Sequence, residues 1–317
     1  MNVWLDFLIT SIAFGATFVY GSTGEILTEK AGHLNLGIPG IMCMGGAGGC
    51  IVLNAIGKSN IPGFLIVLGG IIGALVFSAL CGLLYSVLAV SFRANQNVIG
   101  LTLTTFGVGL SKVIVNKLDP TAYMVGPKKL YRWPFAARTD ALQYLGVLFF
   151  LAMFLAIGAS WILFRTRTGL HLRAVGENPA TADAVGMNVT RYKYMTTCIG
   201  SCIAGMGGFY YIIDYAASQE AYLNVEAFGW LSIALVIFSL WRPHMTIIGS
   251  TIFGILFSCT SYLANIKWLK ITMATTPLLK MLPYVVTIIV LIISSIRNKR
   301  ENQPPASLGL SYFREER

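Results

Sequence analysis

The sequence predicts an all-α, polytopic membrane protein: a single domain, residues 1–317, that forms a bundle of about nine transmembrane helices. Apolar residues make up 56% of the chain and charged residues 11%, whereas soluble domains carry about one quarter charged residues. The apolar residues also fall in continuous runs long enough to cross a bilayer as helices. In the strands of a transmembrane barrel they would alternate with polar residues. Both observations favour a helical bundle.

Polar or glycine- and proline-rich connections separate these runs and set the order of the expected elements. A residue-by-residue comparison reveals no internal repeat, and a polar tail, residues 297–317, follows the last run. The expected spans are residues 3–24, 28–49, 63–92, 98–115, 141–164, 195–213, 228–240, 246–264 and 281–296.

The second span is expected to be interrupted. Gly32, Gly37, Gly40 and Pro39 make residues 28–49 a poor continuous helix. We expect a broken or re-entrant helix, because irregular backbone is tolerated at membrane depth where it lines a cavity. The alternative interpretation is a glycine-rich helix that packs closely against its neighbours.

The most informative polar stretch is the loop of residues 165–194, between two spans. Asn178 and Pro179 form a strong helix start, since Asn caps and Pro fits the first helical position. Gly186 suits a helix stop, which leaves about two turns of helix on a loop flanked by arginines. A short capped helix held between two spans predicts contact with another molecule. The alternative is a surface loop that touches nothing.

Composition and motifs argue against several other classes. The net charge of +10 is carried by Lys and Arg between apolar runs, which indicates membrane topology and no nucleic acid. The six cysteines lie inside apolar runs and the three histidines are scattered, so no metal site is expected. The sequence carries no phosphate-binding GxxxxGK[ST] loop and no GxSxG nucleophile elbow. We therefore predict no catalytic residues and no enzymatic activity.

The interiors of the predicted spans are nearly free of Asp, Glu, Lys and Arg. An ion-coupled carrier needs such groups at membrane depth, because the coupling ion must bind something. Their scarcity favours an energy source supplied by another subunit. A secondary solute carrier and a non-transporting membrane scaffold are the alternatives.

Neutral hydrogen-bonding and small residues are expected to line the path through the bundle. Such a lining suits an uncharged, hydroxyl-bearing solute. Alternatively, each polar group satisfies a neighbouring helix. The predicted path residues are Asn35, Gly37, Pro39, Asn95, Gln96, Asn97, Thr102, Thr105 and Ser232.

Several stretches resemble the permease subunits of bacterial ABC importers for branched-chain amino acids, simple sugars and nucleosides. They are GLHLRAVGENPATADAVGMNVTRYKY at residues 169–194, EKAGHLNLG at 29–37, RANQ at 93–96 and ALVIFSLWRP at 234–243. The tail, PPASLGLSYFRE at 304–315, is similar to that of the nucleoside-type members. Relatives commonly carry an acidic residue where this chain has Pro39, so no role for that carboxylate is transferred.

The resemblance implies that residues 165–194 form a cytoplasmic coupling loop whose short helix docks into an ATP-binding subunit. It also implies a second homologous permease, two ATP-binding subunits or one fused duplicate that hold ATP and Mg²⁺, and an extracytoplasmic solute-binding lipoprotein. This chain, surrounded by membrane lipid, is expected to bind no cofactor. The coupling residues so implied are Gly176, Glu177, Asn178, Pro179, Ala182, Asp183, Ala184 and Gly186.

The resemblance implies an importer subunit of the bacterial cytoplasmic membrane that forms the translocation path for nucleosides. A simple-sugar permease is the alternative within the family. The tail, residues 297–317, is expected inside the cell and the N-terminus outside.

Overall fold

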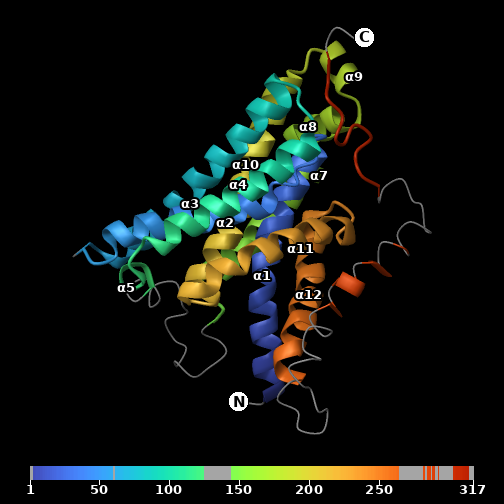
Figure 1. Ribbon diagram of the computed structural model, residues 1–317. Helices are drawn as coiled ribbons and strands as arrows, with labels where there is room; N and C mark the ends of the chain where they lie inside the picture. Colours follow the sequence, from blue (N-terminus) through green and yellow to red (C-terminus); the bar gives the residue numbers. More distant parts are fainter. Residues whose placement is uncertain are drawn as a thin grey trace.

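The computed structural model describes residues 3–59, 61–124, 144–263 and 303–313, together with 281–282, 284–286, 288–289 and 292. Every regular element in these residues is helical. The N-terminus lies at one end of an elongated bundle, and α8, α9 and the C-terminal segment lie at the other (Figure 1). In chain order the helices are α1 (Val3–Lys30), α2 (Ile38–Ile56), α3 (Gly63–Ser86) with a π-helical extension (Val87–Ser91), α4 (Gln96–Asn116), α5 (Pro120–Met124), α7 (Val147–Arg165), α8 (Arg167–Glu177), α9 (Pro179–Ala184), α10 (Val189–Tyr210) with a π-helical extension (Tyr211–Tyr215), a 3₁₀ turn (Gln219–Leu223), α11 (Val225–Phe238) and α12 (Pro243–Leu263).

Seven helical segments of the described chain are long and apolar enough to cross a membrane. α12 carries a shorter apolar stretch, Pro243–Cys259, and the predicted ninth span, residues 281–296, lies mostly outside the described residues. The prediction of a multi-pass helical bundle is confirmed, whereas the number nine is not. The seven segments are Trp4–Lys30, Ile38–Ile56, Gly63–Ser91, Gln96–Asn116, Val147–Arg165, Val189–Tyr215 and Glu220–Phe238.

The interruption expected within residues 28–49 lies between two helices. α1 ends at Lys30, and Gly32, whose φ is +87°, terminates it two residues later. The Gly32 N–H donates to the Glu29 carbonyl and the next N–H donates to the Thr28 carbonyl, which is the Schellman pattern of helix termination. α2 then begins with Pro39 in its first turn. The predicted break therefore exists as a connection, residues 31–37, and a re-entrant helix is not confirmed.

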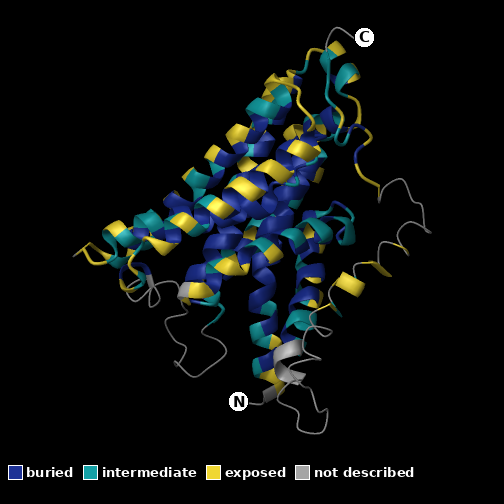
Figure 2. Ribbon diagram, viewed as in Figure 1, coloured by how far each residue is buried: buried dark blue, intermediate teal, exposed yellow. Residues whose placement is uncertain are grey.

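α2 and α10 form the centre of the bundle. In their apolar windows 78% of residues are buried, compared with 33% in those of α3 and α7. Exposed residues accordingly lie along the peripheral helices, α3 and α4 among them (Figure 2). On α3 they include Phe64, Ile72 and Leu80, as expected of a surface that faces lipid tails.

Glycines bring the central backbones into direct contact. A methyl group at Gly24 of α1 would overlap the Gly200 carbonyl of α10, and one at Gly208 would overlap the Met42 carbonyl of α2. A methyl group at Gly45 of α2 would likewise overlap the backbone of α10. Small residues at such crossings are typical of membrane bundles, because dispersion contacts between helices replace the hydrophobic effect there.

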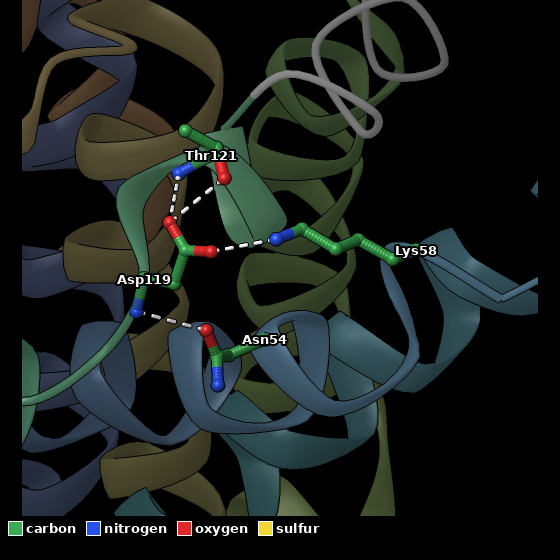
Figure 3. A network of polar contacts seen from close by, with 4 residues as sticks. All are labelled: Asn54, Lys58, Asp119 and Thr121. Atoms are coloured by element: carbon green, nitrogen blue, oxygen red, sulfur yellow. Dashed lines mark hydrogen bonds and ion pairs between the residues drawn. The ribbon is translucent and has the colours of Figure 1, made fainter.

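At the end opposite α9, the short helix α5 is attached to the end of α2 (Figure 3). The Asp119 carboxylate accepts from Lys58 Nζ at 2.6 Å and from Thr121, while the Asp119 N–H donates to Asn54 Oδ1 at 3.0 Å. The bond from Lys58, and then those from Thr121, lower the pKa of Asp119 to about 2. The carboxylate therefore stays charged, and able to accept from Lys58, at pH values above about 2.

We predict that Gly208→Ala destabilises the fold, because its methyl group forces α2 and α10 apart. Overpacking of this kind costs about 1–3 kcal/mol, so the apparent melting temperature in detergent should fall. Gly109→Ala is the matched control: Gly109 lies in α4 with nothing within 4 Å of an added methyl group, and alanine is the better helix former by about 1 kcal/mol. Equal melting temperatures for the two variants would contradict the role of the close approach.

Candidate functional site

The loop of residues 165–194 folds into two helices and the start of a third, each with its own side-chain cap. Thr166 accepts from the Gly169 N–H at 3.2 Å, Asn178 from the Thr181 N–H at 3.0 Å, and Asn188 from the Arg191 N–H at 2.9 Å. The predicted start of α9 at Asn178 and Pro179 is confirmed. α8 and the early start of α10 at Val189 were not predicted, although Thr166 and Asn188 are residue types that signal helix starts.

The predicted end of α9 at Gly186 is confirmed. The φ of Gly186 is +86°, its N–H donates to the Asp183 carbonyl, and the Met187 N–H donates to the Ala182 carbonyl. This is the same Schellman arrangement that ends α1. The short helix is therefore defined at both ends by backbone chemistry.

One side of α9 is buried against the rest of the protein, and the other side is exposed. Ala182 is 2% exposed and packs in a small apolar cluster with Val175 and Val189. Ala184 is exposed, and Val185 is 67% exposed. A partner that docks on α9 would meet Ala184 and Val185 and not Ala182, a distinction that the sequence did not make.

The C-terminal segment, residues 303–313, lies against this loop and ties it to the rest of the bundle. The Ser307 N–H and hydroxyl both donate to the Gly176 carbonyl of α8, at 3.1 and 2.5 Å. The Tyr312 hydroxyl donates to Asp183 of α9 at 2.9 Å, and the Gly309 N–H donates to the Gly32 carbonyl at 3.2 Å. The C-terminal segment thus contacts α8, α9 and the connection between α1 and α2.

That connection is held by three side chains from two helices, α3 and α4. Gln96 of α4 accepts from the Leu34 N–H at 2.8 Å, and Tyr85 of α3 donates to the Leu34 carbonyl at 2.7 Å. Thr104 of α4 donates to the Leu36 carbonyl at 2.8 Å. A connection without helical hydrogen bonds is stable inside the protein only when its backbone groups find such partners.

Two buried carboxyl groups overturn the expectation that span interiors contain almost no charged residues. Glu25 and Glu29 lie in α1 at 0% and 3% exposure, where the sequence placed them beyond the first span. Glu25 accepts from the Asn35 N–H at 3.1 Å, and Glu29 accepts from the Trp241 indole. The bond from the Trp241 indole to Glu29 joins two of the recognised motifs, EKAG and LWRP.

The structure does not bring the predicted path residues together. Asn35 bonds the Gly37 N–H at 2.9 Å and lies buried, and Pro39 packs against Gly229 of α11. Asn95 caps α4, and Ser232 is buried and donates to the Phe228 carbonyl within α11.

The other polar residues that were predicted to line the path lie in α4. Asn97, Thr102 and Thr105 are exposed, and the Thr105 hydroxyl donates to the Leu101 carbonyl of its own helix at 3.1 Å. Gln96, by contrast, is buried and accepts the hydrogen bond from the Leu34 N–H. Of the predicted set, the exposed members therefore lie on one helix.

The described residues form a multi-pass helical membrane bundle with a short capped helix at one end. Residues 7–291 match the family described as the permease component of the branched-chain amino acid transport system. This match covers most of the chain, and the protein belongs to that family.

Relatives match over nearly their whole lengths. The nucleoside ABC transporter permease protein NupC of Lactococcus lactis is 30% identical over 88% of this chain and 89% of its own. The guanosine ABC transporter permease protein NupQ of Bacillus subtilis is 29% identical over 89% and 92%. TsgC13 of Haloferax volcanii, provisionally named a glucose ABC transporter permease protein, is 27% identical over 99% of both chains.

We predict that Tyr312→Phe loosens α9 without changing the fold, because it removes only the hydroxyl that binds Asp183. A hydrogen bond to a charged group contributes about 1.5–3 kcal/mol, so amide exchange in α9 should accelerate by roughly tenfold or more. The control is Tyr222→Phe, whose hydroxyl binds Asn116 at 2.6 Å far from α9. Unchanged exchange in the Tyr312 variant would show that the tail does not restrain the helix.

Proposed function

We propose that this chain is one of two permease subunits of an ATP-driven importer, with nucleosides as its solute. The observation that carries the proposal is α9: a capped helix between two membrane-crossing segments, with Ala184 and Val185 turned away from the protein. The names of NupC and NupQ support nucleosides, and that of TsgC13 keeps a simple sugar as the second solute class.

In this proposal α9 docks on an ATP-binding subunit, which holds ATP and Mg²⁺, and two such subunits or one fused duplicate drive the transporter. The α9 end of the bundle then faces the cytoplasm, which places the C-terminus inside and the N-terminus outside. A solute-binding lipoprotein delivers the solute at the α5 end. Lys128, Lys129 and Arg132, which follow α5 in the sequence, lie outside the described residues.

We further propose that the path runs along the exposed face of α4, between this chain and a second, homologous permease. Thr102 and Thr105 lie on that face beside Leu101 and Phe106, which are 48% and 52% exposed. Alternating hydroxyl and apolar groups suit a solute with hydroxyls and a flat ring. Asn35, Gly37, Pro39, Asn95, Gln96 and Ser232 would then support this face and not contact the solute.

The buried carboxyl groups of α1 would favour a secondary carrier, since ion coupling needs ionisable groups at membrane depth. Glu25 and Glu29 each bind a group of the protein itself, the Asn35 N–H and the Trp241 indole. We therefore assign them to the fold of the connection between α1 and α2.

We predict that Ala184→Arg weakens assembly with the ATP-binding subunit while the bundle stays folded. An added long side chain in a packed interface costs about 1–3 kcal/mol, which corresponds to roughly 5- to 150-fold weaker association. Ala55→Arg is the matched control, because Ala55 is also exposed in the last turn of a helix, α2, at the opposite end. The measurement is copurification of the ATP-binding subunit. Full assembly of the Ala184 variant would remove the docking role.

Solute and energy source are tested together by uptake of labelled guanosine and glucose in cells that express the complete transporter. We expect guanosine uptake that stops when the ATP-binding subunit is deleted. Glucose uptake with the same dependence would select the sugar alternative. Uptake that persists without the ATP-binding subunit would identify a secondary carrier and refute the importer.

A further inference from the structure

A polar cavity of about 660 Å³ opens beside α9. The turn after α3, the first turns of α10 and the C-terminal segment form its walls. This volume lies within the range of about 300–1,000 Å³ that is typical of ligand sites. The side chains that matter for its chemistry are His33, Arg93, Asp183, Arg191, Lys193 and Tyr312.

The cavity is positively charged. Arg93, Arg191 and Lys193 contribute three cations, whereas Asp183 contributes the one carboxylate and already accepts from Tyr312. His33 adds no charge: burial, and then the nearby Lys193, lower its pKa to about 3. His33 is instead tied to Thr197 of α10 by a hydrogen bond of 2.9 Å.

Lys193 is the unusual member of this group. It is only 3% exposed, yet it lines the cavity. The ion pairs Lys58–Asp119 and Lys112–Glu226 do not involve Lys193, and Lys193 has no ion pair with any residue in the described part of the chain. A buried ammonium group without a counter-ion is costly, which makes a bound anion the expected source of compensation.

The start of α10 adds to the attraction. Asn188, Val189 and Thr190 line the cavity, and they belong to the cap and first turn of a helix of 22 residues. The backbone N–H groups of a helix start carry partial positive charge and favour anions, phosphate groups above all. Arginine suits the same ligand, because its planar guanidinium binds phosphate oxygens in pairs.

We propose that this cavity binds a phosphate group, with Lys193 as its buried partner and the exposed Arg93 and Arg191 closing over it. The phosphate belongs either to an anionic lipid headgroup or to a soluble phosphate compound. A lipid is accommodated because Phe92 and Met195, next to the cavity, are 72% and 50% exposed and offer an apolar surface for its acyl chains. A bound phosphate would link α10, the α3–α4 turn and the tail, which are the elements that hold α9.

The test uses the full-length chain in phosphatidylcholine nanodiscs with or without phosphatidylglycerol. Retained lipid is counted by native mass spectrometry, and inorganic phosphate is titrated by calorimetry. Preferential retention of phosphatidylglycerol that inorganic phosphate does not displace identifies a lipid headgroup. Binding of inorganic phosphate in phosphatidylcholine alone identifies a soluble phosphate compound. Both results support the site.

Three variants locate the binding. Lys193→Met should weaken it at least about tenfold, because a charged hydrogen bond is lost, whereas Lys193→Arg should keep most of it. Arg191→Gln changes an exposed residue, so it should weaken binding without affecting folding. Lys112→Met is the control, since Lys112 lies about 24 Å along α4 from the cavity residue Gln96.

Anion binding by Lys193→Met and Arg191→Gln equal to that of the unaltered chain would overturn the proposal. Binding that requires removal of Glu315 and Glu316 would also overturn it, because these two carboxylates would then be the natural occupants. So would a wild-type chain that binds neither anion while Lys193→Met loses the ATP-binding subunit, since an acidic partner residue would then fill the cavity.

Discussion

The close approach of α10 to α1 and α2 is the contact on which the rest of the bundle depends. Gly24, Gly45 and Gly208 allow the backbones to touch, since a methyl group at each would overlap the facing helix. Apolar side chains gain little by leaving lipid for the protein interior, so the hydrophobic effect does not hold these helices together. Close contact between the backbones instead provides favourable dispersion interactions. α3, α4, α7, α11 and α12 then pack around a centre whose spacing is already set.

The packing of α1, α2 and α10 also determines where the connection after α1 lies. α1 and α8 meet at Lys30 and Gly176, where a methyl group on Gly176 would overlap the Lys30 carbonyl. The connection after α1 is therefore enclosed, and its backbone is satisfied by Gln96, Tyr85 and Thr104. Enclosure explains why the buried Glu25 and Glu29 are found there: their carboxylates supply acceptors that an irregular backbone and the Trp241 turn require.

A rigid connection of this kind suits a transmitting role. α9 is fastened to it through the C-terminal segment, by Tyr312 on Asp183 and by Gly309 on Gly32. A force applied to the exposed side of α9 would reach α1, α2 and α4 through these bonds and not through α9 alone. The charged cavity lies on the same route, so occupancy by a phosphate group would stiffen it.

The sequence by itself determined the features that depend on local chemistry. One is the class of helical membrane protein, which follows from apolar runs long enough to cross a bilayer as helices. The others are the start of α9 at Asn178 and its end at Gly186. The tertiary structure decided everything that depends on distant partners. Glu25 and Glu29 are helical and buried because Asn35 and Trp241 meet them, Ala182 faces inward while Ala184 does not, and Gln96 braces a connection sixty residues earlier in the chain. No local pattern encodes these contacts, since each requires two segments whose separation in space is set by the packing of α1, α2 and α10.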